Sequence, residues 1–331
     1  MTSAGRTVAM GVDEHAVGAS IEAPFGRALV ELGRERPELV GLSADLAKYT
    51  DILPFRDAYP DRFFNVGMAE QNLIAVAAGL AKTGRIAVCT TYGVFATRRA
   101  YDFIAIACAH SRADVKIMAG LPGLTTGYGG THQAIEDLGL MTLIPGLAVI
   151  DPCDATEIMQ ATRAAVEHPG PVYMRLQRGQ VPVVLDRARH RFAIGKAALL
   201  RDGGDVGIVS TGLMTGRALE AADALAQEGV TASVLHVATW KPFDREAVAS
   251  LAARTRALVT AENHVVRGGL ASLVAETLFD AGLQRPLERV GLPDRFIECG
   301  STPFLQEKYG LTARHVAEAA RRALGAGRGK P

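Results

Sequence analysis

Short apolar runs, many of them β-branched, alternate with longer amphipathic stretches along almost the whole chain. The runs at 39–42, 63–66, 86–90, 115–118, 148–150 and 172–176 are bounded mostly by Gly, Pro or Asp and are predicted as strands. Between them, 69–83 and 155–167 carry helical periodicity. A second series follows, with strands at 206–210, 232–237, 258–261 and 287–290 and helices at 216–228, 245–255, 269–281 and 313–324. This order favours helices packed around largely parallel sheets.

The alternation is interrupted once, in the middle of the chain. Residues 181–196 mix Pro with basic residues, which is typical of a linker between domains. A length of 331 residues allows two domains of ordinary size. We therefore predict an α/β fold with two doubly wound domains, at 20–185 and 196–326, joined by a linker at 186–195.

Charge and aromatic content exclude some classes of partner. Lys plus Arg number 36 and Asp plus Glu number 35, so no strong net field attracts nucleic acid or anionic lipid. Aromatic residues make up only 6% of the chain, which gives little support to single-strand binding by base stacking. The sequence predicts neither a nucleic-acid partner nor a membrane partner.

Cysteine usage and the chain's start favour a cytoplasmic protein. The four cysteines are far apart, without a CxxC, so neither a disulfide framework nor a zinc site is indicated. The first twenty residues lack an apolar core after a basic start, which argues against a signal peptide. The longest apolar run, 73–81, is far shorter than the about 20 residues needed to span a bilayer.

Several common ligand-binding motifs are missing. The sequence has no GxGxxG at a strand-to-helix turn, no GxxxxGK[ST] loop and no GxSxG. A dinucleotide-dependent dehydrogenase therefore has no fingerprint to support it, and a serine hydrolase lacks its nucleophile elbow.

The most informative stretch is DRFFNVGMAEQN at 61–72, where a predicted strand turns through Gly67 into a helix. Glu70 and Gln71 follow the carboxyl end of that strand, which is where open α/β sheets bind ligands. The alternative is that Glu70 is an acid favoured in the first helical turn by the helix dipole.

The same stretch resembles the pyrimidine-binding domain of thiamine-diphosphate enzymes of the transketolase group, whose pattern is RFFNVGIAEQN. Three further blocks agree in order: SADL at 43–46, YGVFAT at 92–97 and THQAIED at 131–137. KPFD at 241–244, ENHVVRGGL at 262–270 and LQEKYGLT at 305–312 resemble the C-terminal domain of that group. The resemblance extends from about residue 22 to residue 324.

The resemblance implies a cofactor site for thiamine diphosphate. Glu70 would be catalytic, hydrogen-bonding the pyrimidine ring nitrogen and favouring the imino form that removes the thiazolium proton. Tyr92 and Phe95 would stack around the pyrimidine, or else be ordinary core residues. Asp45 would lie near the cofactor, or else be a turn residue. Arg98 stands where a third aromatic residue often follows, so that face of the pocket departs from the family pattern.

The substrate side is implied in the same way. His132 would be a second catalytic residue that faces the substrate and exchanges protons with its hydroxyls. Arg178, in RLQRGQ, would bind the far end of the sugar, and Tyr128 would lie beside the substrate. For His132 the alternative is a histidine bonded to backbone, and for Arg178 a solvated loop charge. We expect His264, in ENH, to be structural or subunit-facing.

Three departures from the family pattern bear on the substrate. The loop reads GYGGTHQ where the family usually has GEDG before THQ. Leu121 is the nearest match to a substrate-binding His, and Glu22 replaces a sugar-phosphate-binding Arg. These changes point to a donor or acceptor other than the common pentose phosphates, or to contacts restored by a partner.

The GDG motif that holds the divalent cation and the diphosphate is absent. We therefore expect the smaller, C-terminal subunit of a split transketolase, with no metal ligands of its own and with Mg²⁺ and the diphosphate held mainly by an N-terminal partner subunit. A heterotetramer of two plus two chains and ketol transfer from a ketose to an aldehyde follow from the resemblance. The alternatives are a 1-deoxyxylulose-5-phosphate synthase-like enzyme, the β subunit of a 2-oxo acid dehydrogenase, and a catalytically silent pairing subunit.

Overall fold

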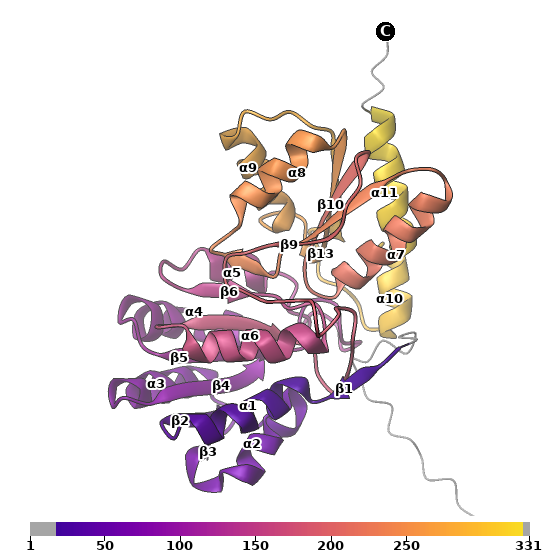
Figure 1. Ribbon diagram of the computed structural model, residues 1–331. Helices are drawn as coiled ribbons and strands as arrows, with labels where there is room; N and C mark the ends of the chain where they lie inside the picture. The colour runs from indigo at the N-terminus through magenta and orange to yellow at the C-terminus, as the bar shows by residue number, and fades with distance from the viewer. Residues whose placement is uncertain (1–17, 327–331) are drawn as a thin grey trace, which may run out of the picture.

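The computed structural model describes residues 18–326, which fold into two α/β domains stacked on each other (Figure 1). Residues 1–17, on which the signal-peptide expectation depends, lie outside the described residues, as do 327–331. All ten predicted strands are present, with ends that differ by at most four residues from those expected. The predicted two-domain α/β fold is therefore confirmed.

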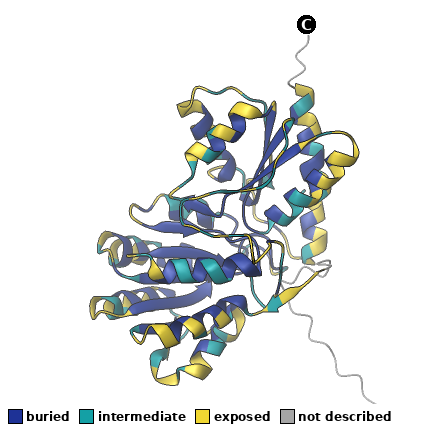
Figure 2. Cartoon of the chain, in the orientation of Figure 1, coloured by how far each residue is buried: buried dark blue, intermediate teal, exposed yellow. Residues whose placement is uncertain are grey.

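The first domain is built on a seven-stranded sheet in the order β12-β6-β7-β5-β4-β2-β3. Its strands are β2 (Leu39–Ser43), β3 (Phe63–Asn65), β4 (Ile86–Tyr92), β5 (Val115–Gly120), β6 (Ala148–Ile150), β7 (Val172–Leu176) and the edge strand β12 (Thr239–Lys241). All neighbours are parallel except β12 and β6. The central strands are buried along their whole length (Figure 2), which explains why they read as continuous apolar runs.

Helices cover both faces of this sheet. They are α1 (Pro24–Glu35), α2 (Leu53–Ala58), α3 (Glu70–Lys82), α4 (Gly93–Phe103), α5 (Asp137–Thr142) and α6 (Ala155–Glu167). Val88 and Met118 join the core beneath α1, α2 and α6, whereas Cys89 and Ile117 join the core beneath α3, α4 and α5. Successive side chains of a strand point to opposite faces, so both faces are packed. Short 3-10 turns lie at Ala47–Thr50 and Pro60–Arg62, and α4 continues into a π-helix at Ile104–His110.

The second domain repeats this plan on a five-stranded sheet in the order β14-β13-β10-β11-β9. Its strands are β9 (Ala198–Arg201), β10 (Val206–Ser210), β11 (Ala232–His236), β13 (Ala257–Val265) and β14 (Leu287–Leu292), all parallel to their neighbours except β9. Helices α7 (Met214–Gln227) and α11 (Ala313–Ala326) pack on one face. Helices α8 (Arg245–Arg254) and α9 (Leu270–Asp280) pack on the other, and α10 (Thr302–Lys308) lies beside the domain junction (Figure 1).

The two domains share a core and a sheet. Strand β12 belongs to the second domain in sequence, yet it pairs antiparallel with β6 of the first. Between its ends, Trp240 is buried and donates an indole hydrogen bond of 3.0 Å to Thr211 Oγ1. Lys241 Nζ donates to the carbonyl oxygens of Thr142 (2.8 Å) and Ile144 (2.5 Å). The second domain is thereby fixed to the edge of the first.

The connection between the domains runs close to the surface of both. After β8 (Gln180–Pro182), which pairs with β1 (Ser20–Glu22), residues 183–197 contain neither helix nor strand. Phe192 and Ile194 nevertheless pack against the core beneath α1 and α6. Among residues 18–326, no helix combines the length and apolar character that crossing a bilayer requires.

Candidate active site

The carboxyl ends of β2, β3, β4 and β5 meet at one edge of the first sheet, and most of the predicted site residues lie there. Asp45 follows β2, Glu70 follows β3, Tyr92 ends β4, and Leu121 follows β5. Asp45 and Leu121 have φ angles of 59° and 52°. Left-handed backbone is uncommon for residues other than Gly and tends to gather at functional sites. Two of the four strand ends are thus followed by a residue with strained backbone.

Glu70 begins helix α3 after a tight turn. Gly67, with φ 77°, permits the turn from β3, and Ala69 precedes the first helical residue. The Glu70 side chain is only 5% exposed, and its Oε1 accepts a hydrogen bond of 3.0 Å from Arg99 Nη1. Glu70 is therefore a buried, ion-paired carboxylate rather than a solvent-exposed acid at a helix start.

An aromatic cluster lies on the other side of Arg99 from this carboxylate. The ring centroids of Tyr92 and Phe95 lie 5.6 Å apart, and the imidazole of His132 is 5.3 Å from Phe95 and 6.1 Å from Tyr92. Tyr128 joins at 5.2 Å from His132. Burial raises the pKa of the Tyr92 phenol, so Tyr92 stays neutral. The structure therefore brings together four predicted residues from two segments, YGVFAT at 92–97 and GYGGTHQ at 127–133.

Arg99 was not predicted as a site residue. It lies one helical turn after Phe95 in α4, and its guanidinium carbon is 4.1 Å from the centroid of the Phe95 ring. The same guanidinium binds Glu70, so Arg99 links the carboxylate to the aromatic cluster. The i, i+4 spacing of an aromatic and a cation on one helix face was the available signal, because residues at that spacing are neighbours.

The neighbouring Arg98 serves the GYGG loop instead. Its Nε donates to Glu136 Oε1 at 2.5 Å and its Nη1 donates to the carbonyl oxygen of Gly130 at 2.8 Å. Arg98 therefore connects two parts of the segment that carries Tyr128 and His132, and these two bonds fix the shape of the loop. Thr131 Oγ1 lies 2.9 Å from His132 Nδ1 and helps to set the orientation of the imidazole.

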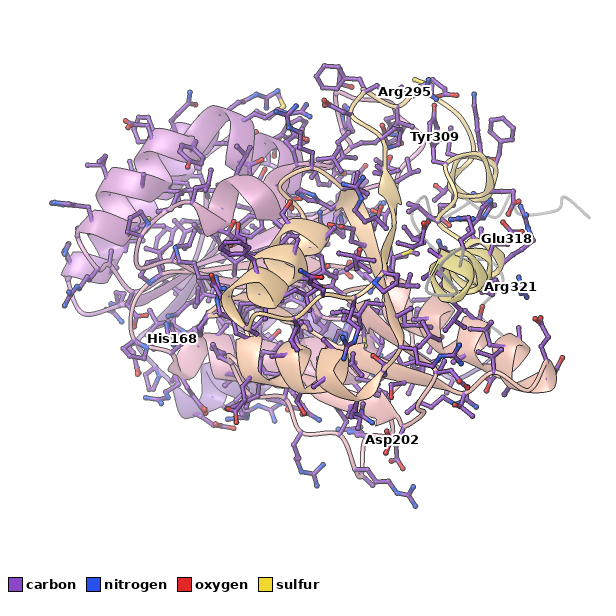
Figure 3. All side chains as sticks on the ribbon, turned by 90° about the horizontal axis from the view of Figure 1, so that it is seen from above. His168, Asp202, Arg295, Tyr309, Glu318 and Arg321 are labelled. Atoms are coloured by element: carbon purple, nitrogen blue, oxygen red, sulfur yellow. The ribbon has the colours of Figure 1, made fainter. Side chains whose placement is uncertain are left out.

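The second domain braces the same loop from the other side. Tyr128 forms an isolated antiparallel bridge with Cys299, and the Gly300 N–H donates to the carbonyl of Gly127 at 3.1 Å. A Cβ on Gly127 would lie 2.1 Å from the Gly300 carbonyl oxygen, so only glycine fits. The segment that carries Cys299 and Gly300 has a further contact: the Arg295 guanidinium carbon lies 5.1 Å from the centroid of the Tyr309 ring (Figure 3).

Asp45 is bound into a local turn. The Asp45 N–H donates to Asn65 Oδ1 at 2.9 Å, and Asn65 Nδ2 donates to Asp45 Oδ1 at 3.0 Å. The Gly67 N–H also donates to Asn65 Oδ1, at 3.2 Å. These bonds account for Asp45 as a turn residue, the alternative weighed for it, and leave its role toward a cofactor as a prediction. The same Asn65 shapes the approach to Glu70.

Arg178 and Leu121 line a cavity of about 650 Å³ between the two domains. The Arg178 guanidinium is 5.7 Å from the centroid of the Tyr49 ring, and its charge also acts on Tyr92. Arg217 and Gln306 contribute from the second domain and bind each other at 2.5 Å. The cavity therefore extends the candidate site from the strand ends toward the second domain.

A buried ion pair supports the motif that carries His132. Arg175 Nη2 and Nε donate to the two carboxylate oxygens of Asp137 at 2.5 and 2.9 Å, and the Tyr173 hydroxyl donates to Asp137 at 2.6 Å. Burial alone would raise the pKa of Asp137, but Arg175 holds it below its ordinary value. His264 Nε2 accepts from the Gly139 N–H at 3.1 Å, which fits the structural role expected for that histidine.

Comparison with known proteins places both halves of the chain. Residues 18–184 match the transketolase pyrimidine-binding domain, and residues 195–316 match the transketolase C-terminal domain. A solved structure described as a split gene transketolase, inactive β4 tetramer, superposes with a TM-score of 0.86 at 45% identity and covers 93% of this chain and 99% of that one.

Sequence relatives agree. A transketolase family protein of Sinorhizobium fredii is 54% identical over 89% of this chain and 86% of its own length. A 6-deoxy-6-sulfo-D-fructose transketolase subunit of Clostridium sp. is 44% identical over 88% and 90%. The chain spans about half of the 1-deoxy-D-xylulose-5-phosphate synthase of Heliobacterium modesticaldum, at 38% identity over 92% of this chain and 47% of that protein. The chain belongs to the transketolase family, in which its relatives include proteins of the split type.

Proposed function

We propose that the chain is the pyrimidine-binding subunit of a thiamine-diphosphate enzyme that transfers a two-carbon ketol unit from a ketose to an aldehyde. The observation that carries this proposal is that Arg99 links the buried Glu70 carboxylate to the cluster of Tyr92, Phe95 and His132 at the ends of parallel strands. When bound, the cofactor supplies the carbanion that accepts the two-carbon unit.

The residues present suit the pyrimidine half of that cofactor. A flat heteroaromatic ring requires an apolar aromatic surface and a hydrogen-bonding group at its edge. Tyr92 and Phe95 offer the surface, and Glu70 offers a carboxyl group that is 5% exposed. Glu70 would hydrogen-bond the ring nitrogen and favour the imino tautomer, whose exocyclic nitrogen can take up a proton. Asp45, at the adjacent strand end, would lie near the same ring.

The substrate would lie on the other side of the cluster. The His132 imidazole, in contact with Tyr128 and Phe95, would exchange protons with substrate hydroxyls. Arg178, at the mouth of the domain cavity, would bind the distal anionic end of the sugar. Glu22 and Leu121 replace an arginine and a histidine that would contact the sugar phosphate in the family pattern. Ketoses that differ in the group at their distal end are therefore the donors that would identify the substrate.

A second subunit would complete the site. Large apolar side chains surround it: Met68 is 82% exposed, Phe296 74% and Phe304 56%. Exposed apolar patches of this kind mark surfaces that another chain covers. The split gene transketolase of known structure is described as an inactive β4 tetramer, which fits a chain that needs a different partner for activity. That partner would hold Mg²⁺ and the diphosphate in a two-plus-two assembly.

The proposal is tested by turnover of the assembled complex. The chain is co-purified with a diphosphate-binding transketolase subunit, and ketose phosphates, a 6-sulfo ketose and pyruvate are compared as donors with one aldehyde acceptor. We expect turnover with a ketose and none by either chain alone. Turnover with pyruvate instead would favour the synthase-like or dehydrogenase-like alternative.

A variant of Glu70 separates catalysis from mere pairing. Glu70→Gln should lower turnover by about 10²- to 10⁴-fold, the usual contribution of a positioned acid or base. Glu31→Gln, on the exposed face of α1, is the matched control and should leave turnover unchanged. Undiminished turnover in Glu70→Gln would favour the silent-subunit alternative.

A further inference from the structure

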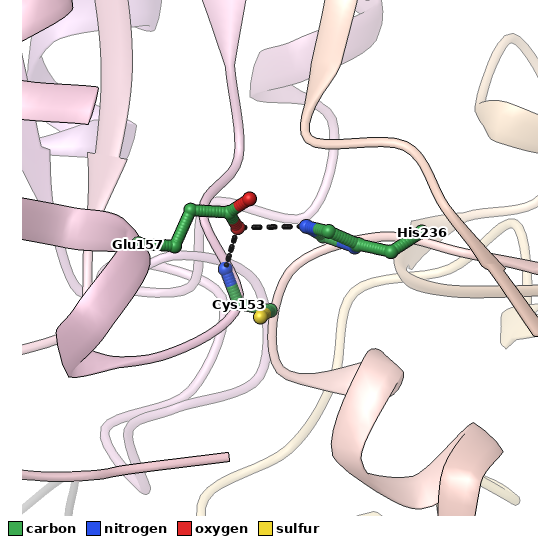
Figure 4. A group of neighbouring side chains, drawn as sticks. All are labelled: Cys153, Glu157 and His236. Carbon is green, nitrogen blue, oxygen red and sulfur yellow. Dashed lines mark hydrogen bonds and ion pairs between the residues drawn. The ribbon is translucent and has the colours of Figure 1, made fainter. Parts of the chain in front are cut away.

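Three side chains of the kinds that bind metal ions meet where the two domains join. Cys153 follows β6, Glu157 lies in the first turn of α6, and His236 ends β11 (Figure 4). One ligand atom from each lies within 4.8 Å of the others. All three are nearly sealed from solvent, with exposures of 4%, 1% and 1%. The cluster combines sulfur, oxygen and nitrogen donors from two domains.

Neighbouring groups orient two of these side chains as they would in a metal centre. His236 Nδ1 lies 2.7 Å from Thr215 Oγ1, which directs Nε2 toward Glu157 Oε2 at 2.7 Å. The other carboxylate oxygen, Oε1, lies 3.0 Å from Nε2 of His190. Histidine ligands of metals typically hold their second nitrogen in a hydrogen bond, and carboxylate ligands are likewise anchored.

The charge of the cluster also suits a divalent ion. Glu157 contributes the one carboxylate among the three side chains, and Cys153 can contribute a thiolate. A divalent cation would bring two positive charges to one thiolate and one carboxylate, giving a neutral group that is far less costly to bury.

We propose that Cys153 Sγ, Glu157 Oε2 and His236 Nε2 bind one Zn²⁺ ion at the junction of the two domains. Mixed thiolate, carboxylate and imidazole donors are characteristic of Zn²⁺, and three protein ligands leave the fourth tetrahedral position open. Cys153 also lines the cavity of about 650 Å³, which provides a route for the ion. The site is independent of the proposed ketol transfer.

Binding requires local proton movement. The Cys153 thiol gives up its proton to solvent and coordinates as thiolate. His236 frees its Nε2 lone pair by losing the proton that bonds Glu157 Oε2: in a neutral imidazole this proton moves through solvent to Nδ1, and in an imidazolium it passes to solvent while Nδ1 keeps its own proton toward Thr215. The 2.7 Å hydrogen bond between Nε2 and Oε2 is then replaced by two bonds to the metal. Uptake of the ion should therefore release at least one proton per site.

Cobalt provides a direct test, because Co²⁺ occupies zinc sites and gives a thiolate-to-cobalt charge-transfer band. The full chain is stripped with a chelator and titrated with Co²⁺. We expect one equivalent to bind with this band, and one equivalent of Zn²⁺ to remove it. Cys153→Ser should abolish the band, whereas Cys299→Ser, at the exposed cysteine, should retain it. A band that survives in Cys153→Ser, or binding without any band, would overturn the proposal.

A measurement on the unmodified chain covers the case in which Cys153→Ser fails to fold. X-ray absorption of the zinc-loaded protein should show one sulfur at about 2.3 Å and nitrogen or oxygen ligands at about 2.0–2.2 Å. A shell of nitrogen and oxygen alone, or no zinc retained after desalting, would mean that the cluster is only a hydrogen-bonded contact between the domains.

Discussion

Asp137→Asn breaks the buried ion pair beneath the loop that carries His132. Asp137 is fully buried and Arg175 is 2% exposed, so the substitution puts an amide in place of the nearer carboxylate of a buried arginine charge and leaves it only the more distant Asp151, at 3.5 Å. Removing one partner of a buried pair typically costs about 3–5 kcal/mol. An unfolding entropy of about 2.1 cal/mol/K per residue over 331 residues converts this to a fall in Tm of roughly 4–7 °C.

The assay is thermal and urea unfolding at several pH values. The Arg175 charge keeps the pKa of Asp137 below its ordinary value, so the pair stabilises the protein above the unfolded-state pKa of about 3.9. This stability is lost as the pH falls through the lower folded-state pKa. The difference between wild type and Asp137→Asn should thus be full at pH 7 and shrink below about pH 4.

The control is an exposed ion pair of similar length. Asp280 lies 2.8 Å from Arg245, with exposures of 65% and 48%, and Asp280→Asn should change Tm by about 1 °C or less. If Asp137→Asn were as mild as Asp280→Asn at pH 7, the reasoning about the buried pair would be refuted.

Three further predictions concern the site and the second domain. Phe95→Ala in the assembled complex should raise the apparent Kd for thiamine diphosphate about 2- to 10-fold through lost ring contact, as measured by titration calorimetry; an unchanged Kd would place the pyrimidine elsewhere. His132→Gln should lower kcat about 10²- to 10⁴-fold with little change in cofactor Kd, and a change in Kd alone would assign it a binding role. Burial raises the pKa of Glu262 to about 8, so between pH 5 and 8 the folded state holds a proton that the unfolded state has lost. As the pH rises through this range, the free energy of unfolding in urea should therefore fall by up to about 1.4 kcal/mol per pH unit in wild type but not in Glu262→Gln. Equal slopes of this free energy against pH in the two proteins would contradict the prediction.

Much of the fold was predictable because the central strands are buried on both faces. Such strands read as uninterrupted apolar runs between turn residues, as 172–176 does, and the structure has a strand at Val172–Leu176. Strand β12 was not predicted, because three residues, Thr239–Lys241, carry no period of their own. Its place in the first sheet depends on pairing with β6, more than 80 residues earlier in the chain, as the register Thr239 to Ile150 shows.

Some residues of the candidate site could be predicted from the sequence and others could not. Glu70, Tyr92, Phe95 and His132 were predicted from motifs; the structure clusters the three rings and connects Glu70 to them through Arg99. Arg99 was missed because its importance comes from contacts with two other residues rather than from a pattern of its own. The proposed zinc ligands were not predicted from the sequence for a related reason. Cys153 and His236 come from different domains, and the spacing between them matches no zinc-binding motif.

The most direct test of the proposed function is the rate at which the thiazolium proton of bound thiamine diphosphate exchanges with deuterium in the assembled complex. This reports cofactor activation alone, before any substrate is added. If Glu70 holds the pyrimidine nitrogen, Glu70→Gln should slow the exchange by at least about 100-fold while the cofactor stays bound. Exchange at the wild-type rate in Glu70→Gln would contradict the role assigned to Glu70, and with it the placement of the cofactor at this site.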